Sequence, residues 1–210
     1  MYPNPAFRLE DLPRLHQHLR DHALALLISQ TDAGPLVSHL PLWLAPDEGP
    51  YGTLYGHLAR SNPQAEALVE DGRVLAVFQG PQAYVSSTFY PSKAEHGRVV
   101  PTWNYQAVHA RGTVEVFDEP ERLLPLLERL TDSHEAGRDC PWRVADAPAD
   151  YVQGMLRAIR GLRLPLDSLQ GIAKLSQNRP AADREGVRQG LAASRAPSDQ
   201  ALATLMTPSS

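Results

Sequence analysis

The stretch FQGPQAYVSSTFYPSKAEHGRVVPTWNY, from Phe78 to Tyr105, carries most of the information about the fold of this chain. It holds six aromatic residues, and hydroxyl, amine and amide side chains stand between them. Flat apolar faces beside polar donors suit a planar heteroaromatic ligand. A loop that packs its own aromatic side chains against a partner chain has the same composition, so these residues leave both interpretations open.

Short segments with strand or helix patterns lie on both sides of this stretch. Apolar runs and alternating patterns predict strands at 23–29, 35–44, 51–58, 73–78, 83–87, 102–117 and 161–169, with a turn at 79–82. Leucines at helical spacing and helix-start signals predict helices at 9–19, 62–71, 118–130 and 148–159. Short strands with a few helices around them predict an α+β fold built on a barrel or an open sheet.

Two helix starts have specific signals. Asn62 precedes Pro63, which places a capping side chain before a residue whose φ is already helical. Asp118 and Glu121 stand three residues apart, which is the spacing of an N-terminal capping box. Residues 1–191 are expected to form one domain, whereas the tail at 192–210, rich in Ala and Ser, is expected to be poorly ordered.

Composition limits the class of protein. The 19 prolines among 210 residues favour short elements over a long helical bundle. The net charge of −4 lacks the basic excess that supplies most affinity for nucleic acid, so direct DNA binding is not expected. The N-terminal segment is charged and broken by prolines, and no apolar run approaches the length of a membrane span. We therefore expect a cytoplasmic protein without a membrane partner.

Cysteine and histidine give no sign of a metal centre. Cys140 is the only cysteine, so no intramolecular disulfide forms, and a structural thiol is the expected role. The eight histidines are not grouped in a ligand pattern, and no metal is expected. Nucleophile, phosphate-loop and dinucleotide motifs are also missing, so no catalytic residue is assigned.

The segment GHLARSNP, residues 56–63, joins a predicted strand to a predicted helix start. Free backbone amides at a helix N-terminus favour an anion, and Arg60, Ser61 and Asn62 add side-chain donors. This turn is therefore a candidate phosphate site. The simpler interpretation is a helix N-cap beside one solvated arginine.

A third segment, KLSQNRPAADREGV at residues 174–187, follows the last predicted strand. It gathers several side-chain donors within a few residues: Lys174, Ser176, Gln177, Asn178, Arg179 and Arg184. Such a segment either folds back over a ligand or starts a solvated helix at Pro180.

Taken together, these segments resemble the PaiB-type FMN-binding negative transcriptional regulators, a branch of the FMN-binding split-barrel superfamily that also contains pyridoxamine phosphate oxidases. The resemblance is carried by MYPNPAF, SHLPLWL, GHLARSNP, VFQGPQAYVSSTFYPSKAEHGRVVPTWNYQAVHARG, LTDSHEAGRDCPW and KLSQNRPAADREGV. They occur in the family's order over residues 1–191. The resemblance implies a split β-barrel with peripheral helices, FMN as cofactor, and a homodimer with the flavin at its interface.

The resemblance also implies which residues bind the cofactor. In that superfamily the strand matching SHLPL runs along the flavin ring, the turn matching GHLARSN receives the phosphate, and residues matching the C-terminal segment approach from near the chain end. The implied cofactor-binding residues are His39, Leu40, Leu42, His57, Arg60, Ser61, Asn62, Trp103, Asn104, Lys174, Gln177 and Asn178.

The chain departs from the family pattern just before the SQN segment, residues 176–178. The family usually carries a lysine and an aromatic residue where this chain has Ile172 and Ala173, and an acidic residue is common at the position of Gln170. If that aromatic residue packs on the flavin edge, its loss weakens flavin binding by about 0.5–1.5 kcal/mol.

Three functions follow from the resemblance. The first is a flavin-dependent regulatory or redox protein, and the second is a transcriptional repressor that acts directly on DNA. No helix-turn-helix pattern supports the second. The alternative is a flavin oxidoreductase of the pyridoxamine phosphate oxidase kind, in which the flavin carries the chemistry and the protein positions it.

Overall fold

The computed structural model describes residues 4–207, and the chain divides into two compact units. The first unit combines Met1–Leu15, Gln79–Val108 and Gln170–Ser210, and the second combines His16–Phe78 and His109–Leu169. Three long strands continue from one unit into the other: β6 (Arg73–Val85), β7 (Thr102–Thr113) and β9 (Ile159–Lys174). No helix within residues 4–207 is both long enough and apolar enough to cross a membrane.

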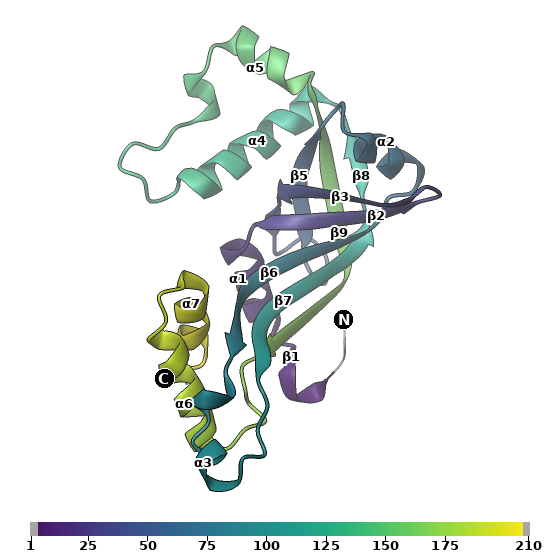
Figure 1. Ribbon diagram of the computed structural model, residues 1–210. Coiled ribbons are helices and arrows are strands. Elements are labelled where there is room, and N and C mark those ends of the chain that lie inside the picture. Colours follow the sequence, from purple (N-terminus) through teal and green to yellow (C-terminus); the bar gives the residue numbers. More distant parts are fainter. Residues whose placement is uncertain (1–3, 208–210) are drawn as a thin grey trace. The chain divides into compact units, whose positions relative to one another are not determined.

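The second unit is an antiparallel sheet with helices beside it (Figure 1). Its strands and helices, besides the long strands, are α1 (Leu12–Asp21, shared with the first unit), β2 (Leu24–Thr31), β3 (Gly34–Pro41), β4 (Trp43–Ala45), β5 (Thr53–Ala59), α2 (Pro63–Glu70), β8 (Glu115–Phe117), α4 (Pro120–Glu135) and α5 (Ala149–Leu156). Hydrogen-bonded strands follow the order β3-β2-β6-β7-β9-β5-β4.

Strand alternation sets the core of the second unit. Leu54 and Leu58 on β5 are buried with Gly56 between them, because every second side chain of a strand points to the same face. Helix α4 covers part of the sheet with Leu123 and Leu126, which pack with Phe117 in one apolar cluster. A helix with leucines at this spacing buries one face, as the sequence predicts.

The first unit contains the ends of the long strands and several helices (Figure 1). Its other elements are the 3-10 turns η1 (Pro5–Phe7) and η2 (Ser87–Phe89), the short strand β1 (Arg8–Leu9), and the helices α3 (Ser92–His96), α6 (Ala181–Ala192) and α7 (Pro197–Leu205). The apolar cluster of this unit joins Val85 and Tyr90 to Val187, Leu191 and Leu202.

Helix α6 approaches η2 closely because it presents glycine there. A Cβ added to Gly190 would lie 2.5 Å from the Phe89 ring, and one added to Gly186 would collide with the Phe89 carbonyl oxygen. Backbone approach this close requires residues without a Cβ. The two glycines are four residues apart on one helix face. They therefore determine how α6 packs on Phe89, in the aromatic segment at 78–105.

The expected turn at 79–82 is wrong, because β6 continues from Arg73 to Val85 without a break. Pro81 lies in β6 beyond Val74–Val77, the part of the strand for which pairing with β2 is recorded. Ser198 of α7 instead bonds to the backbone of Gln82, accepting from its N–H at 3.0 Å and donating to its carbonyl oxygen at 2.7 Å.

The expected capping box at Asp118 is also wrong. Helix α4 begins at Pro120 after Glu119, and no side chain caps it. Proline needs no N–H partner at this position, so the helix starts without the cap. The Asp118 carboxylate pairs with Arg60 instead, at 3.0 Å.

The chain end differs from the expectation as well. Instead of a poorly ordered tail, residues Pro197–Leu205 form helix α7, which buries Leu202 and Ala203 in the cluster of the first unit. Residues 208–210 lie outside the described part of the chain. Strand β9 also extends five residues beyond the predicted strand, to Lys174.

Leu202 and Leu205 test whether α7 stabilises the first unit. Leu202→Ala removes a fully buried side chain, and we expect it to lower the free energy of unfolding by about 2–5 kcal/mol. Leu205→Ala, on the same helix but 40% exposed, is the matched control and should cost less than about 1 kcal/mol. Urea unfolding measures both, and two equally small losses would contradict a structural role for α7.

Candidate functional site

The cofactor-binding residues implied by the sequence fall into two groups, one in each unit. The first group lies in the second unit and comprises His39, Leu40, Leu42, His57, Arg60, Ser61 and Asn62. The second group lies in the first unit and comprises Trp103, Asn104, Lys174, Gln177 and Asn178. The two groups are described separately below.

The turn before α2 is organised by Asn62. Its side-chain oxygen accepts a hydrogen bond from the Gln64 N–H at 2.9 Å, and its amide donates to Ser38 Oγ at 2.9 Å. The Ala65 N–H donates to the Asn62 carbonyl oxygen at 2.9 Å. The N-cap prediction is confirmed, but Gln64 and Ala65 already have internal acceptors and do not supply the free amides that the phosphate interpretation expected.

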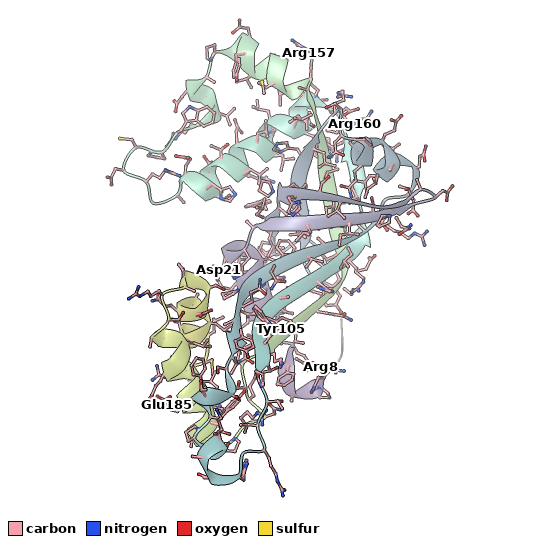
Figure 2. All side chains as sticks on the ribbon, in the orientation of Figure 1. Arg8, Asp21, Tyr105, Arg157, Arg160 and Glu185 are labelled. Carbon is pink, nitrogen blue, oxygen red and sulfur yellow. The ribbon has the colours of Figure 1, made fainter. Side chains whose placement is uncertain are left out.

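The Arg60 guanidinium is held by the protein on several sides. It donates to both carboxylate oxygens of Asp118, at 3.0 and 3.3 Å, and to the carbonyl oxygens of Arg157 and Ile159, at 2.9 and 3.3 Å. Figure 2 labels Arg157 and also Arg160, whose guanidinium lies 3.6 Å from Asp118. Arg60 is thus an anchored cation, not the freely solvated arginine of the simpler interpretation.

Strand β3 and Leu42, the residue after its end, present two different faces. Leu40 and Leu42 point into the core beside Gly56, where an added Cβ would lie 2.6 Å from Leu42. His39 lies on the opposite, exposed face, paired in register with Leu26 of β2. A ligand bound over the exposed face of His39 would contact Leu40 or Leu42 only through their backbone atoms.

That exposed face of β2 and β3 is apolar. Val37 and Leu24 are exposed on it, and they share it with His39 because paired residues of antiparallel strands point to the same side. An apolar sheet face of this kind suits a flat ligand or a second protein surface.

His57 stands apart from this face, on β5 opposite Gly161 of β9. Its Nδ1 atom is buried and has no hydrogen-bond partner among the described residues. Burial lowers the pKa of the imidazole below its ordinary value of 6.5.

In the first unit, Lys174 ties the end of β9 to the start of β7. Its ammonium donates to Thr102 Oγ1 at 2.6 Å and to the Trp103 carbonyl oxygen at 2.7 Å. Burial, and then the nearby Arg179 charge, lowers the pKa of this ammonium below its ordinary value. The Trp103 ring is 53% exposed and contacts the equally exposed Tyr84 edge-to-face, with ring centroids 6.2 Å apart.

The SQN segment forms a tight turn. Ser176 has a left-handed φ of 62°, and its Oγ accepts from the buried Asn104 amide at 2.9 Å. The side-chain oxygen of Gln177 accepts from the Leu175 N–H, and its side-chain nitrogen donates to the Ala173 carbonyl oxygen. Asn178 is exposed. The structure therefore brings Asn104, Lys174 and Gln177 together as a network around the end of β9.

Ile172 and Ala173, the departures from the family pattern, are both buried. Ile172 packs in an apolar cluster with Phe7, Ala107 and Tyr105. Position 172 thus contributes to the core of the first unit, and the effect of the departure on flavin affinity stays a prediction.

The sequence reasoning did not select Tyr84, Arg98 or Asp183, although each lies in a segment that it quoted. Tyr84 is the exposed residue between buried Ala83 and Val85, and this alternation is visible in the sequence. Asp183 is buried, and no local pattern distinguishes it from a solvated acidic residue at a helix start.

Comparison with known proteins shows the family. A family model described as "Putative FMN-binding domain" matches residues 1–168. The chain belongs to this family. The Bacillus subtilis protein named protease synthase and sporulation protein PAI 2 is 30% identical over 98% of this chain and 96% of its own length. An uncharacterized Aspergillus fumigatus protein is 34% identical, with 90% of each chain covered.

Solved structures agree on the fold. The FAD and heme binding protein from Mycobacterium smegmatis superposes with a TM-score of 0.61, at 17% identity, over 85% of this chain and 78% of its own. A 5-nitroimidazole antibiotic resistance protein from Bacteroides thetaiotaomicron, described as putative, gives a TM-score of 0.57 at 16% identity, over 79% and 85%. The predicted α+β flavin-binding split barrel and the PaiB-type resemblance are confirmed, and a flavin is the cofactor that these findings support.

The residues present fit a flavin. In the first unit, the exposed Trp103 and Tyr84 rings offer flat apolar surface, and the Lys174 ammonium bonds to the Trp103 carbonyl oxygen. The second unit offers the exposed apolar face of β2 and β3, and the exposed Ser61 hydroxyl beside the anchored Arg60. Each unit, taken by itself, thus contains groups of the kinds that suit a planar ring or a phosphate.

His57 predicts a pH dependence of stability. Below pH 6.5 the unfolded chain binds a proton at His57 more readily than the folded chain, whose pKa is lower. The free energy of unfolding should therefore fall as the pH falls. We expect His57→Gln to reduce the difference in unfolding free energy between pH 7.5 and pH 5.5. Exposed His134→Gln is the control, and equal pH dependence in both variants would exclude His57 as the cause.

Proposed function

We propose that this protein is a homodimer that binds FMN and serves as a flavin-dependent regulatory or redox protein. The observation that carries the proposal is the exposed Trp103–Tyr84 pair beside Lys174, in the segment by which the chain resembles its family. Two exposed aromatic side chains in contact with each other form an apolar patch that suits a ligand or a partner. A bound flavin supplies redox chemistry, and the protein supplies position and electrostatics.

The flavin phosphate is assigned to the turn at Ser61 and Asn62. Ser61 adds a hydroxyl donor at the start of the eight-residue helix α2, whose dipole favours an anion. Arg60 adds positive charge from a fixed position, because Asp118 and two carbonyl oxygens hold its guanidinium. Holding the cation in place lowers the entropic cost of binding.

The homodimer accounts for exposed apolar surface in both units. Leu24 and Val37 in the second unit and Val100 and Trp103 in the first are all exposed. An obligate interface of about 2,000 Å² or more is expected from surface of this kind. Sedimentation equilibrium at micromolar concentration should give the mass of two chains, and the mass of one chain would contradict the dimer.

The regulatory part of the proposal rests on sequence similarity to a relative. The Bacillus subtilis relative carries a name that refers to protease synthesis and sporulation. With a net charge of −4, this chain is proposed to regulate through its flavin or a protein partner and not by direct contact with DNA. An oxidoreductase of the pyridoxamine phosphate oxidase kind remains the alternative, and turnover of a reduced nicotinamide or pyridoxamine phosphate would favour it.

Trp103 tests the proposed flavin contact. Trp103→Ala should weaken FMN by about threefold to tenfold, since a lost aromatic contact costs about 0.5–1.5 kcal/mol. Trp142→Ala, in the second unit and 48% exposed, is the matched control and should leave FMN affinity unchanged. Quenching of flavin fluorescence on titration measures both, and equal affinities would remove Trp103 from the site.

Arg60 and Asp118 test the proposed phosphate contact. Arg60→Ala should weaken FMN roughly tenfold to a hundredfold and leave riboflavin affinity unchanged, because charge-assisted bonds contribute about 1.5–3 kcal/mol and riboflavin has no phosphate. Asp118→Asn keeps the arginine and removes its carboxylate partner, so FMN binding should be retained. Equal losses for FMN and riboflavin in Arg60→Ala would show that Arg60 acts only through the fold.

A further inference from the structure

Two segments that lie far apart in the sequence meet around a cavity in the first unit. The cavity has a volume of about 410 Å³, within the range of small-molecule sites. Arg98 and His96 line it from the segment after η2, and Arg179 and Asp183 line it from the start of α6. None of these residues belongs to the cofactor-binding set implied by the family.

The two arginines of the cavity lack acidic partners. Neither Arg98 nor Arg179 forms an ion pair with any carboxylate in the described part of the chain. Arg179 stacks over the buried Tyr90 ring, 5.0 Å from its centroid. The attraction between the cation and the face of the ring holds the guanidinium close to Tyr90.

The one carboxylate at the cavity is already satisfied. Asp183 is 2% exposed and accepts from both the backbone N–H and the hydroxyl of Ser92, at 3.1 and 2.7 Å. Its role is to tie α6 to the start of α3. The lining groups therefore carry net positive charge, with two arginines against one buried carboxylate.

His96 adds a donor to this set. Its Nδ1 atom accepts a hydrogen bond from the Arg98 backbone N–H at 3.0 Å. A neutral imidazole that accepts at Nδ1 carries its proton on Nε2, which is then free to donate. Both residues are exposed, and the hydrogen bond holds the backbone of Arg98 next to the histidine.

Helix α6 contributes its N-terminus. It is twelve residues long, Pro180 precedes it, and no side chain caps it. The amides of this helix start have no side-chain cap, and the acidic residue of its first turn, Asp183, bonds to Ser92. The lowered pKa of Lys174, caused first by burial and then by Arg179, agrees with a positive potential in this part of the unit.

We propose that this cavity is an oxyanion site that binds the phosphate group of a phosphate monoester, through the guanidinium groups of Arg98 and Arg179. A fork-shaped guanidinium meets two phosphate oxygens at once, and the unpaired positive charge matches a dianion. The proposal goes beyond the flavin function, because the site can be filled without a flavin. The phosphate group belongs to a second small molecule or, if the assignment of the flavin phosphate to the turn at Ser61 and Asn62 fails, to FMN.

Phenyl phosphate is the probe for the test. Isothermal titration of the full chain, free of flavin, should show binding, and Arg179→Gln should weaken it about tenfold to a hundredfold. Arg98→Gln should also weaken it. Arg195→Gln, which removes the same charge from an exposed position of the same unit, should bind like the unaltered chain.

Competition distinguishes the two sources of the phosphate. If FMN displaces phenyl phosphate and riboflavin does not, the site holds the flavin's own phosphate, and the assignment of that phosphate to the turn at Ser61 and Asn62 is wrong. If FMN and phenyl phosphate bind together, the site serves a second molecule. Either result supports the oxyanion site, provided that near-ultraviolet circular dichroism shows the variants folded.

Two results would overturn the proposal. One is no binding of phenyl phosphate by the unaltered chain at millimolar concentration. The other is equal affinity in the unaltered chain and in folded Arg179→Gln. FMN binding is measured separately in the same samples, so failure of this proposal and failure of the flavin proposal give different results.

Discussion

The buried carboxylate of Asp183 is the constraint on which the first unit depends. A charge that is 2% exposed is costly unless hydrogen bonds satisfy it, and Ser92 supplies two, from its backbone N–H and its hydroxyl. These bonds fix the start of α6 against the start of α3. With Gly186 and Gly190 allowing close approach to Phe89, they determine where the aromatic segment and the SQN segment meet.

The second unit depends on a comparable arrangement at its surface. The Asp118–Arg60 pair joins the residue after β8 to the turn before α2, and Arg60 also bonds to carbonyl oxygens where α5 ends and β9 begins. Exposed ion pairs contribute little to stability when they act alone. Here the Arg60 guanidinium bonds to both carboxylate oxygens of Asp118 and to two carbonyl oxygens. These bonds hold the cation in a fixed position next to Ser61 in the chain.

Several buried polar atoms lack partners among the described residues, including His57 Nδ1, Tyr90 OH and Asn104 Oδ1. Each costs free energy that a hydrogen bond would recover, and native proteins contain few such atoms. Tyr90 lies under the Arg179 guanidinium, and Asn104 bonds to Ser176 through its other side-chain atom. Two of the three therefore lie in the network that joins the aromatic segment to the SQN turn.

The sequence by itself determined the local elements and the family. Apolar periodicity located β2, β5 and α4, and the Asn62-Pro63 pair located α2, because these signals act over a few residues. Tertiary structure decided that Asp118 pairs with Arg60 instead of capping α4, that β6 passes through Pro81, and that α7 packs through Leu202. It also decided that Arg98 and Arg179 line one cavity. The partner of a charged or apolar side chain depends on which distant segments fold together, and periodicity along the chain does not encode that choice.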